Sequence, residues 1–357
     1  NRILYIDPSF SMHKRPNKIM NNKLFSHFLD TVNKNIYLLK VPRSLPFKLI
    51  PILNTLNYIR YAKIINKVIE QLNFTDYILW IYNTEYYPVL KYFKYKKLVL
   101  DIIDSPLAYI NKRGILFYLN QKSNERYTNK LAEKCDLCIV TAKTLFETYK
   151  PIANEKLVQI SNGFDKKLFF ERDNIIPEDL KGIPKPIIGF TGALFSHLDY
   201  RLIDYIAENN PECSIVLIGA ILSGVGGEIK KLKRKNNIYF LGSKAKELIP
   251  SYIKEFNVCI SPFKTDNFCQ NVNPLKVYEY LACGKPVVSV KMKALEEEKV
   301  SSLIDFSDNY NDFIYKIQYW LYNDTEIKQK ERIEIVKNYS WDNLFKKLND
   351  ICIALNE

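Results

Sequence analysis

The second half of this chain is a series of short apolar runs, separated by helix-length segments in which polar residues recur at regular spacing. This alternation predicts a parallel β-sheet whose strands are joined by crossover helices. The runs are residues 186–194, 214–219, 237–242, 258–263 and 286–290. Several of them end in glycine or proline, as expected where the carboxyl ends of parallel strands face a ligand. We therefore expect a doubly wound domain with a binding site at that edge of its sheet.

A helix with a charged first turn is expected between the last two of these runs. Asn273 is a favourable N-cap and Pro274 a favourable first helical residue, so the helix should begin here and end at Gly284. Backbone amides at a helix N-terminus attract phosphate, and Lys276 adds a positive charge. Glu279 follows on the same face and can accept two sugar hydroxyls. The pattern predicts one end of a nucleotide-sugar site; the alternative is an amphipathic helix with a surface lysine and glutamate.

The order of these motifs resembles the donor-binding domain of GT-B glycosyltransferases of the family 4-like type. It is closest to the teichuronic-acid type and also similar to the xanthan glucuronosyltransferase type. The resemblance is carried by the strand ends 191–192, 217–219, 240–242 and 261–263 and by the long run 274–288, with weaker echoes at 161–165 and 339–341. It implies an α/β fold in which two Rossmann-like doubly wound domains face a cleft. The residues that it places at the donor are Gly192, Leu241, Gly242, Pro262, Asn273, Pro274, Leu275, Lys276, Val277 and Glu279.

The chain departs from the family pattern at two places. Asn271 stands where many family 4 enzymes have a first glutamate, and Ala193 and Leu198 stand about where an arginine and a lysine are usual. Neutralisation of the donor diphosphate is therefore expected to depend mainly on Lys276 and the helix amides. The resemblance implies a UDP-sugar rather than a GDP-sugar as donor, and no bound metal or other cofactor.

The first half of the chain shows the same alternation and is expected to form a second doubly wound sheet. Its strand-like runs are residues 2–6, 35–39, 77–82, 97–103, 137–141 and 157–161. Charge and three prolines interrupt the pattern between residues 170 and 186. This interruption predicts a domain boundary, and the resemblance implies an acceptor-binding domain at 1–172 and a donor-binding domain at 183–339, with a final helix at 340–357 packing back on the first domain.

Basic residues are concentrated near the start of the chain. Residues 1–97 contain 16 Lys and Arg against 5 Asp and Glu, a net charge of +11 out of +13 for the whole chain. Segments 43–53, 58–65 and 92–97 mix apolar and basic residues, which is typical of helices at a membrane surface. The alternative is a helix packed on its own sheet with a solvated basic face.

The expected partners follow from this charge. An anionic membrane surface and a glycan or polyprenyl-linked acceptor fit the basic half, whereas nucleic acid is not expected because no RNA- or DNA-reading motif accompanies the charge. No apolar run is long enough to span a bilayer, and the first residues suit a strand rather than a signal peptide. We expect a cytoplasmic protein, peripheral at the inner face of the plasma membrane.

The seven cysteines are an odd number and lie mostly in apolar runs, which indicates free thiols in a reducing compartment. Cys135 and Cys138 have the spacing of a metal-binding pair. No second ligand pair accompanies them, so no metal site is expected there.

The candidate catalytic residues lie in the first half. Asp104 follows the strand run 97–103, where it can face the cleft, and Asp101 lies within that run. In the resembling enzymes an acidic or histidine residue near this strand end approaches the reacting sugar, so Asp104 is the first candidate, Asp101 the second and His13 the third. The alternative for both aspartates is to cap the following helix. Of the other histidines, His27 is expected in a helix and His197 after the Gly192 turn.

These residues predict a glycosyltransferase that moves a sugar from a nucleotide donor to a hydroxyl of a cell-envelope glycan or a lipid-linked acceptor. An inverting reaction requires an aspartate base such as Asp104, whereas in a retaining reaction the leaving phosphate can take the acceptor proton. Two alternatives remain open: a nucleotide-sugar epimerase of the same architecture, and a binding or scaffold subunit with a degenerate donor site, which Asn271 and Ala193 make plausible.

Overall fold

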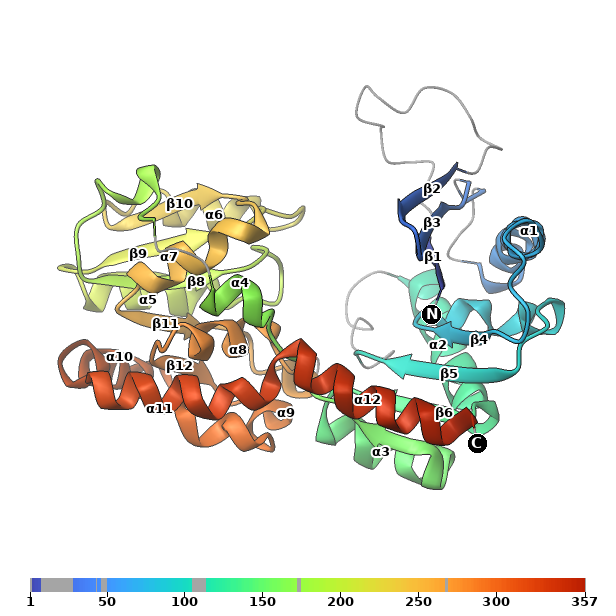
Figure 1. Cartoon of the computed structure of the whole chain (residues 1–357). Coiled ribbons are helices and arrows are strands. Elements are labelled where there is room, and N and C mark those ends of the chain that lie inside the picture. Colours follow the sequence, from blue (N-terminus) through green and yellow to red (C-terminus); the bar gives the residue numbers. More distant parts are fainter. Residues whose placement is uncertain are drawn as a thin grey trace. The chain divides into compact units, whose positions relative to one another are not determined.

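The computed structural model describes residues 2–7, 28–42, 44–45, 50–104, 114–171, 175–266 and 269–356. It divides into two compact units (Figure 1). Unit 1 contains residues 1–139 and 148–158, and unit 2 contains residues 140–147 and 159–357. Because the two units are described separately, the predicted domain limits and the packing of the last helix on the first domain stay predictions.

Within its described residues, unit 1 has two sheets where the sequence predicts one. The first sheet has the order β1-β3-β2, in which β1 (Ile3–Asp7) is parallel and β2 (Phe28–Asn33) antiparallel to β3 (Ile36–Lys40). The second has the order β4-β5-β6-β7, formed by β4 (Ile78–Ile81), β5 (Lys97–Ile102), β6 (Leu137–Val140) and β7 (Leu157–Gln159). Six of these seven strands coincide with the predicted apolar runs.

The seventh strand, β2, lies where the sequence predicts a helix around His27, so that expectation is wrong for residues 28–33; His27 itself lies outside the described residues. Strand β2 forms because the chain makes a tight hairpin to β3. The Asn33 side-chain oxygen accepts the backbone N–H groups of Asn35 at 2.9 Å and Ile36 at 3.0 Å, which closes a two-residue turn. Asparagine favours such turns because its side chain can bond to the backbone just ahead of it.

The helices of unit 1 are α1 (Pro51–Gln71), α2 (Ile115–Lys134) and α3 (Lys143–Ala153), the last of which crosses into unit 2. Helix α1 buries Tyr61, Ala62 and Val68 in a core that also contains Leu39 of β3. Most of the predicted interfacial segment 58–65 therefore packs on its own domain, as the alternative held. The first turn of α1 is not packed in this way, because its Ile52 side chain is 82% exposed.

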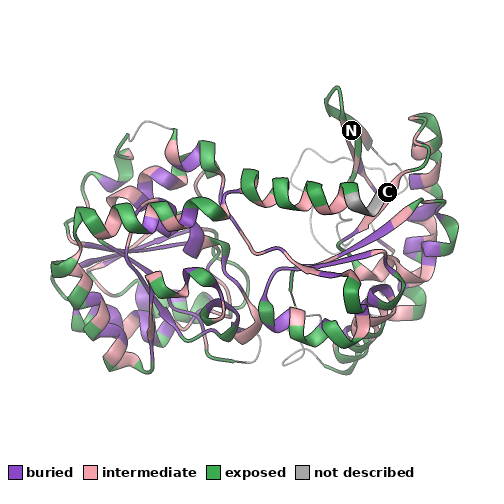
Figure 2. Ribbon diagram, turned by 60° about the horizontal axis from the view of Figure 1, so that its bottom comes forward, coloured by how far each residue is buried: buried purple, intermediate pink, exposed green. Residues whose placement is uncertain are grey.

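Unit 2 is built on a parallel sheet with the order β10-β9-β8-β11-β12-β13. The sequence predicts a parallel sheet and all of these strands except β13. The strands are β8 (Ile187–Thr191), β9 (Ser214–Ile218), β10 (Ile238–Gly242), β11 (Val258–Ser261), β12 (Val287–Val290) and β13 (Ile304–Ser307). From β8 the chain adds β9 and β10 on one side of the sheet and then β11, β12 and β13 on the other, so the strand order reverses between β8 and β11. In such sheets, ligands bind at the carboxyl ends of the strands beside this reversal. The four central strands of the sheet are buried, the edge strands β10 and β13 are partly buried, and the helices on both faces turn exposed sides outward (Figure 2).

The helices of unit 2 are α4 (Lys166–Phe170), α5 (Tyr200–Asn209), α6 (Gly226–Leu232), α7 (Ile249–Glu255), α8 (Leu275–Ala282), α9 (Lys293–Glu296), α10 (Tyr310–Asn323), α11 (Glu326–Val336) and α12 (Trp341–Asn356). In the part of the chain that the structure describes, no helix is both long and apolar enough to cross a membrane.

Two glycines let the strand ends approach closely at the carboxyl edge. Gly192 and Gly219 follow β8 and β9 with φ of 137° and 148°, a region that residues with a side chain rarely adopt. A Cβ at Gly219 would lie 2.0 Å from the Gly192 carbonyl oxygen. The backbones at Gly192 and Gly219 therefore pack directly on each other, with no side chain between them.

Candidate functional site

Helix α8 begins one residue later than predicted. Pro274 is the residue before the helix, with extended backbone, and Leu275 is the first helical residue. Asn273 is not an N-cap. Its amide nitrogen donates to the Tyr278 hydroxyl at 2.9 Å and to the Thr141 carbonyl at 3.3 Å. This buried network explains the error, because it gives the asparagine partners other than the helix amides.

The Lys276 side chain points to the carboxyl edge of the sheet. Its ammonium nitrogen lies 4.7 Å from the ring centre of Phe190 in β8 and 4.5 Å from that of Phe263, two residues beyond β11. A Cβ built on Gly192 would lie 3.0 Å from Lys276 Cε. The cation therefore sits in front of β8 and β11, the two strands that flank the reversal of the sheet.

This position is electrostatically costly for a lysine. Burial lowers the pKa of Lys276 to about 8, and the nearby Glu279 carboxyl and Cys269 thiol only partly oppose this effect. The two aromatic faces attract the ammonium group but do not replace its hydration. A bound polyanion would supply the missing counter-charge, so the site is suited to a diphosphate.

Glu279 lies one turn further along α8, where the sequence predicts it. Burial raises its pKa to about 7, against the lowering effects of Lys246 and Lys276. Lys246 also makes an ion pair with Asp165 at 3.9 Å. The carboxyl group is half-buried beside a cation, so it is placed to accept hydroxyl hydrogen bonds once ionised.

The two weaker sequence echoes meet behind the start of α8. Asn162 donates its side-chain N–H to the Asn273 carbonyl at 2.6 Å. The Phe164 N–H bonds to the Tyr339 carbonyl at 3.1 Å, and the Trp341 N–H bonds to the Phe164 carbonyl at 2.9 Å. Segment 161–165 thus supports the backbone just before α8, and segment 339–341 in turn holds segment 161–165 in place.

The other predicted donor residues lie around the same edge. Gly242 ends β10 with φ of 68°, Leu241 is half-buried beside it, and the Pro262 carbonyl accepts the N–H of Asp199 at 2.8 Å. Leu275 is 39% exposed at the helix start.

Val277 is the exception among these residues. Its side chain is fully buried, and its N–H bonds to the Pro274 carbonyl at 3.1 Å. The amides of the first helical turn that a phosphate can approach are therefore those of Leu275 and Lys276.

The candidate catalytic residues lie in unit 1 and are described within that unit. Asp101, in β5, accepts the Trp80 indole N–H at 3.2 Å, and burial raises its pKa to about 6. The strand ends at Ile102, so strand alternation does not extend to Asp104, which is exposed two residues further on. His13 lies outside the described residues.

Sequence reasoning missed the residues that surround Lys276. Phe190 is internal to its apolar run and Phe263 ends its run, and the contact of both rings with Lys276 depends on tertiary packing rather than on any motif. It also missed a cluster formed by His197, Asp266 and Cys269, which follow the same two strands, β8 and β11, that Lys276 faces. The spacing of these three residues follows no metal-binding motif, so only the fold brings them together.

Comparison with known proteins places this site in a family context. Residues 185–323 match the family model of group 1 glycosyl transferases. A putative teichuronic acid biosynthesis glycosyltransferase, TuaH of Bacillus subtilis (strain 168), is 26% identical over 201 residues, which cover 54% of this chain and 50% of the relative. This chain thus aligns with about half the length of that relative.

Solved structures share the architecture over most of the chain. Sucrose-phosphate synthase from Thermosynechococcus elongatus superposes with a TM-score of 0.70 at 13% identity, covering 99% of this chain and 88% of its own. Anabaena HepE, solved in complex with UDP and glucose, gives a TM-score of 0.65 at 18% identity, covering 89% and 86%. The chain therefore has the GT-B fold, and its residues 185–323 are similar to group 1 glycosyl transferases.

Proposed function

We propose that this protein is a glycosyltransferase that moves a sugar from a UDP-sugar to a hydroxyl of a cell-envelope glycan or lipid-linked acceptor. The observation that carries the proposal is the position of Lys276, whose ammonium group lies between Phe190 and Phe263 in front of β8 and β11. The family match at residues 185–323 supports a nucleotide-sugar donor. The UDP complex of HepE supports uridine as its base, and the likeness to TuaH supports a cell-envelope product.

On the donor side, catalysis is mainly stabilisation of the leaving group. As the bond between sugar and diphosphate breaks, negative charge grows on the diphosphate, and Lys276 with the first amides of α8 neutralises it. The surrounding aromatic rings exclude water, which strengthens this attraction by lowering the local dielectric constant. Glu279, in its ionised form, accepts hydrogen bonds from the ribose hydroxyls and fixes the register of the donor.

On the acceptor side, a carboxylate of unit 1 is proposed as the base. The acceptor hydroxyl loses its proton to Asp104 or Asp101 while its oxygen bonds to the sugar and UDP departs. Asp101, with a pKa of about 6, is ionised at neutral pH and is oriented by Trp80. This route applies to an inverting reaction; in a retaining one the leaving diphosphate takes the proton.

The proposal includes attachment of unit 1 to an anionic membrane. Several large apolar side chains are exposed near the starts of α1 and α2, among them Ile52 at 82%, Leu56 at 54%, Ile115 at 70% and Leu119 at 46%. The two helices pack against each other in unit 1, and the first 97 residues carry a net charge of +11. Apolar side chains flanked by basic charge are typical of surfaces that bind lipid headgroups.

Sedimentation with liposomes tests the membrane part. The parent should sediment with anionic vesicles and much less with neutral ones, and Ile52→Asp with Ile115→Asp should weaken this binding. Tyr322→Asp is a matched control, because Tyr322 is 81% exposed on α10 in unit 2. If the variant with both Ile52→Asp and Ile115→Asp bound anionic vesicles as the parent does, the starts of α1 and α2 would not be the membrane-binding surface.

Product analysis tests the enzymatic part. A thermal-shift panel of UDP-, GDP-, CDP- and TDP-sugars first identifies the donor, which we expect to be a UDP-sugar. The preferred donor is then incubated with and without polyprenyl-linked and glycan acceptors. A sugar–acceptor product that requires both substrates supports transfer. An epimerised nucleotide-sugar formed without acceptor would favour an epimerase, and failure of every nucleotide to stabilise the protein would favour a scaffold subunit.

A further inference from the structure

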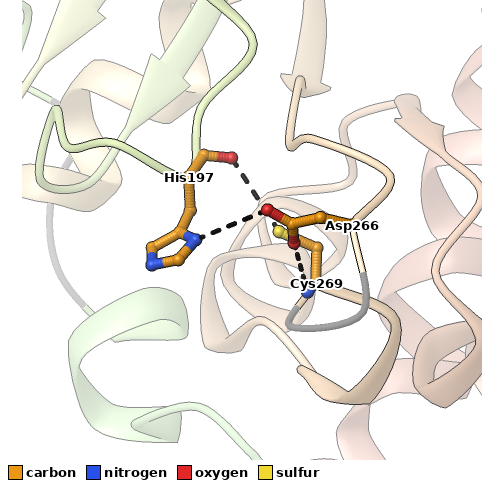
Figure 3. Close-up of side chains that lie close together, drawn as sticks. All are labelled: His197, Asp266 and Cys269. Atoms are coloured by element: carbon orange, nitrogen blue, oxygen red, sulfur yellow. Dashed lines mark hydrogen bonds and ion pairs between the residues drawn. The ribbon is translucent and has the colours of Figure 1, made fainter. Parts of the chain in front are cut away.

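Three side chains with different metal-binding atoms lie together in unit 2: His197, Asp266 and Cys269 (Figure 3). Their ring nitrogen, carboxylate oxygen and sulfur atoms all lie within 4.8 Å of one another. His197 Nδ1 lies 4.0 Å from Asp266 Oδ2. Cys269 is buried, His197 is half-buried and Asp266 is exposed, so an ion can reach the cluster from the Asp266 side.

The backbone holds these three residues in place. His197 follows β8 and the Gly192 turn, whereas Asp266 and Cys269 follow β11, which is the neighbour of β8 in the sheet. The Lys264 N–H bonds to the His197 carbonyl at 2.9 Å, which ties the two segments together. The Cys269 N–H donates to Asp266 Oδ1 at 3.1 Å, and the Cys269 thiol donates to the His197 carbonyl at 3.9 Å. The cluster is therefore formed before any ligand arrives.

We propose that His197, Asp266 and Cys269 bind a zinc ion. Imidazole, thiolate and carboxylate are the ligands that zinc takes, whereas magnesium and calcium take oxygen ligands only. Zinc bonds of about 2.0 to 2.3 Å in a tetrahedral site place neighbouring ligand atoms roughly 3.5 Å apart. The 4.0 Å between His197 Nδ1 and Asp266 Oδ2 therefore needs to close by only about half an ångström.

The charges of the site balance. On binding, the Cys269 thiol releases its proton to solvent, so the thiolate and the Asp266 carboxylate together neutralise the two positive charges of the ion. A neutral complex does not repel the ammonium group of Lys276, which Cys269 influences electrostatically. Three protein ligands leave the fourth zinc position open to an oxygen ligand from solution.

The ion would tie the segment after β8 to the segment after β11, and Lys276 lies in front of these same two strands. Zinc would therefore order the part of the sheet edge to which we assign the diphosphate. This goes beyond the proposed transfer reaction, for which the residues around Lys276 suffice without a metal. The alternative is that the three side chains only brace two loops through their hydrogen bonds.

Zinc titration of the full chain separates these alternatives. The protein is stripped with a chelator and titrated with zinc alone in competition with a chromophoric chelator. We expect about one ion per chain, with affinity reduced roughly tenfold to a hundredfold by Asp266→Asn and at least as much by Cys269→Ser. Cobalt in place of zinc should give a thiolate-to-cobalt absorption band in the parent that Cys269→Ser abolishes. Cys352→Ser, in α12, controls for loss of a thiol elsewhere.

Two results would overturn the proposal: a parent protein that does not compete with the chelator for zinc, or a Cys269→Ser variant that binds zinc as the parent does. Circular dichroism confirms folding of each variant, and the exposed Asp266 gives a substitution that leaves the core intact. UDP binding is measured in parallel without metal. UDP binding without zinc binding would reject the metal site alone, whereas zinc binding without UDP binding would reject only the donor site.

Discussion

Replacing Lys276 by methionine should stabilise the free protein while weakening its affinity for a diphosphate. The pKa of Lys276 falls from 10.5 to about 8 because the ammonium group is buried. At about 1.4 kcal/mol per pH unit, keeping this charge costs the folded chain about 3 kcal/mol at neutral pH. Methionine has a similar length and packs well on aromatic rings, so it can fill the space beside Phe190 and Phe263.

The pH dependence gives the sign of the effect. Below a pH of about 8 the lysine is charged in both the folded and the unfolded chain, so the full cost is present. Between about 8 and 10.5 the folded chain releases the proton first, and the stability of the parent rises with pH. The advantage of Lys276→Met should therefore be largest at pH 7 and should shrink across this window.

Thermal unfolding at pH 7 and pH 9.5 measures this difference. Allowing for partial solvation of the side chain, we expect Lys276→Met to be more stable by about 1 to 3 kcal/mol at pH 7. This corresponds to a rise in melting temperature of roughly 2 to 10 °C. UDP at a fixed concentration, close to the Kd of the parent, should raise the melting temperature of the parent more than that of the variant. Lys330→Met, on the exposed face of α11, is the matched control. A variant that unfolds at or below the melting temperature of the parent would refute the burial argument.

Two further predictions concern pH and the base. Affinity for UDP-glucose, measured by calorimetry, should be greatest near pH 7.5: it should fall above about 8 as Lys276 loses its proton and below about 7 as Glu279 gains one. An affinity that is flat from pH 6 to 9 would contradict both assignments. If the reaction inverts, Asp104→Asn should lower turnover by roughly a hundredfold with little change in donor affinity. Turnover close to that of the parent would move the role to Asp101, tested by Asp101→Asn, or to His13.

The sequence predicts the parallel sheet of unit 2 well because its signals are local. Apolar runs of strand length mark β8 to β12, and the charged helix that contains Lys276 and Glu279 begins within one residue of the expected place. The surroundings of Lys276 were not predictable in this way. Phe190 reads as a core residue of its strand, and only the packing of α8 across the sheet edge places a cation on its ring.

The errors arise where tertiary contacts override local preference. Asn273 is a favourable N-cap in isolation, but its side chain pairs with Tyr278, so Pro274 precedes the helix instead. In unit 1, β2 forms because the Asn33 side chain closes a hairpin, and the single expected sheet appears as two. The cluster of His197, Asp266 and Cys269 joins residues from two segments about 70 positions apart, which no sequence spacing reveals.

Calorimetry with UDP and uridine tests most directly whether the start of α8 is the donor site. In the parent, UDP should bind more tightly than uridine because Lys276 neutralises the diphosphate. Lys276→Ala should weaken UDP binding by roughly tenfold to a hundredfold, the effect of losing one charge-assisted hydrogen bond, and should leave uridine binding nearly unchanged. Glu279→Ala should weaken both ligands, since its partner is the ribose, and Lys330→Ala should weaken neither. If Lys276→Ala and Glu279→Ala both bound UDP as the parent does, helix α8 would not be the donor site and the glycosyltransferase account would lose its main support.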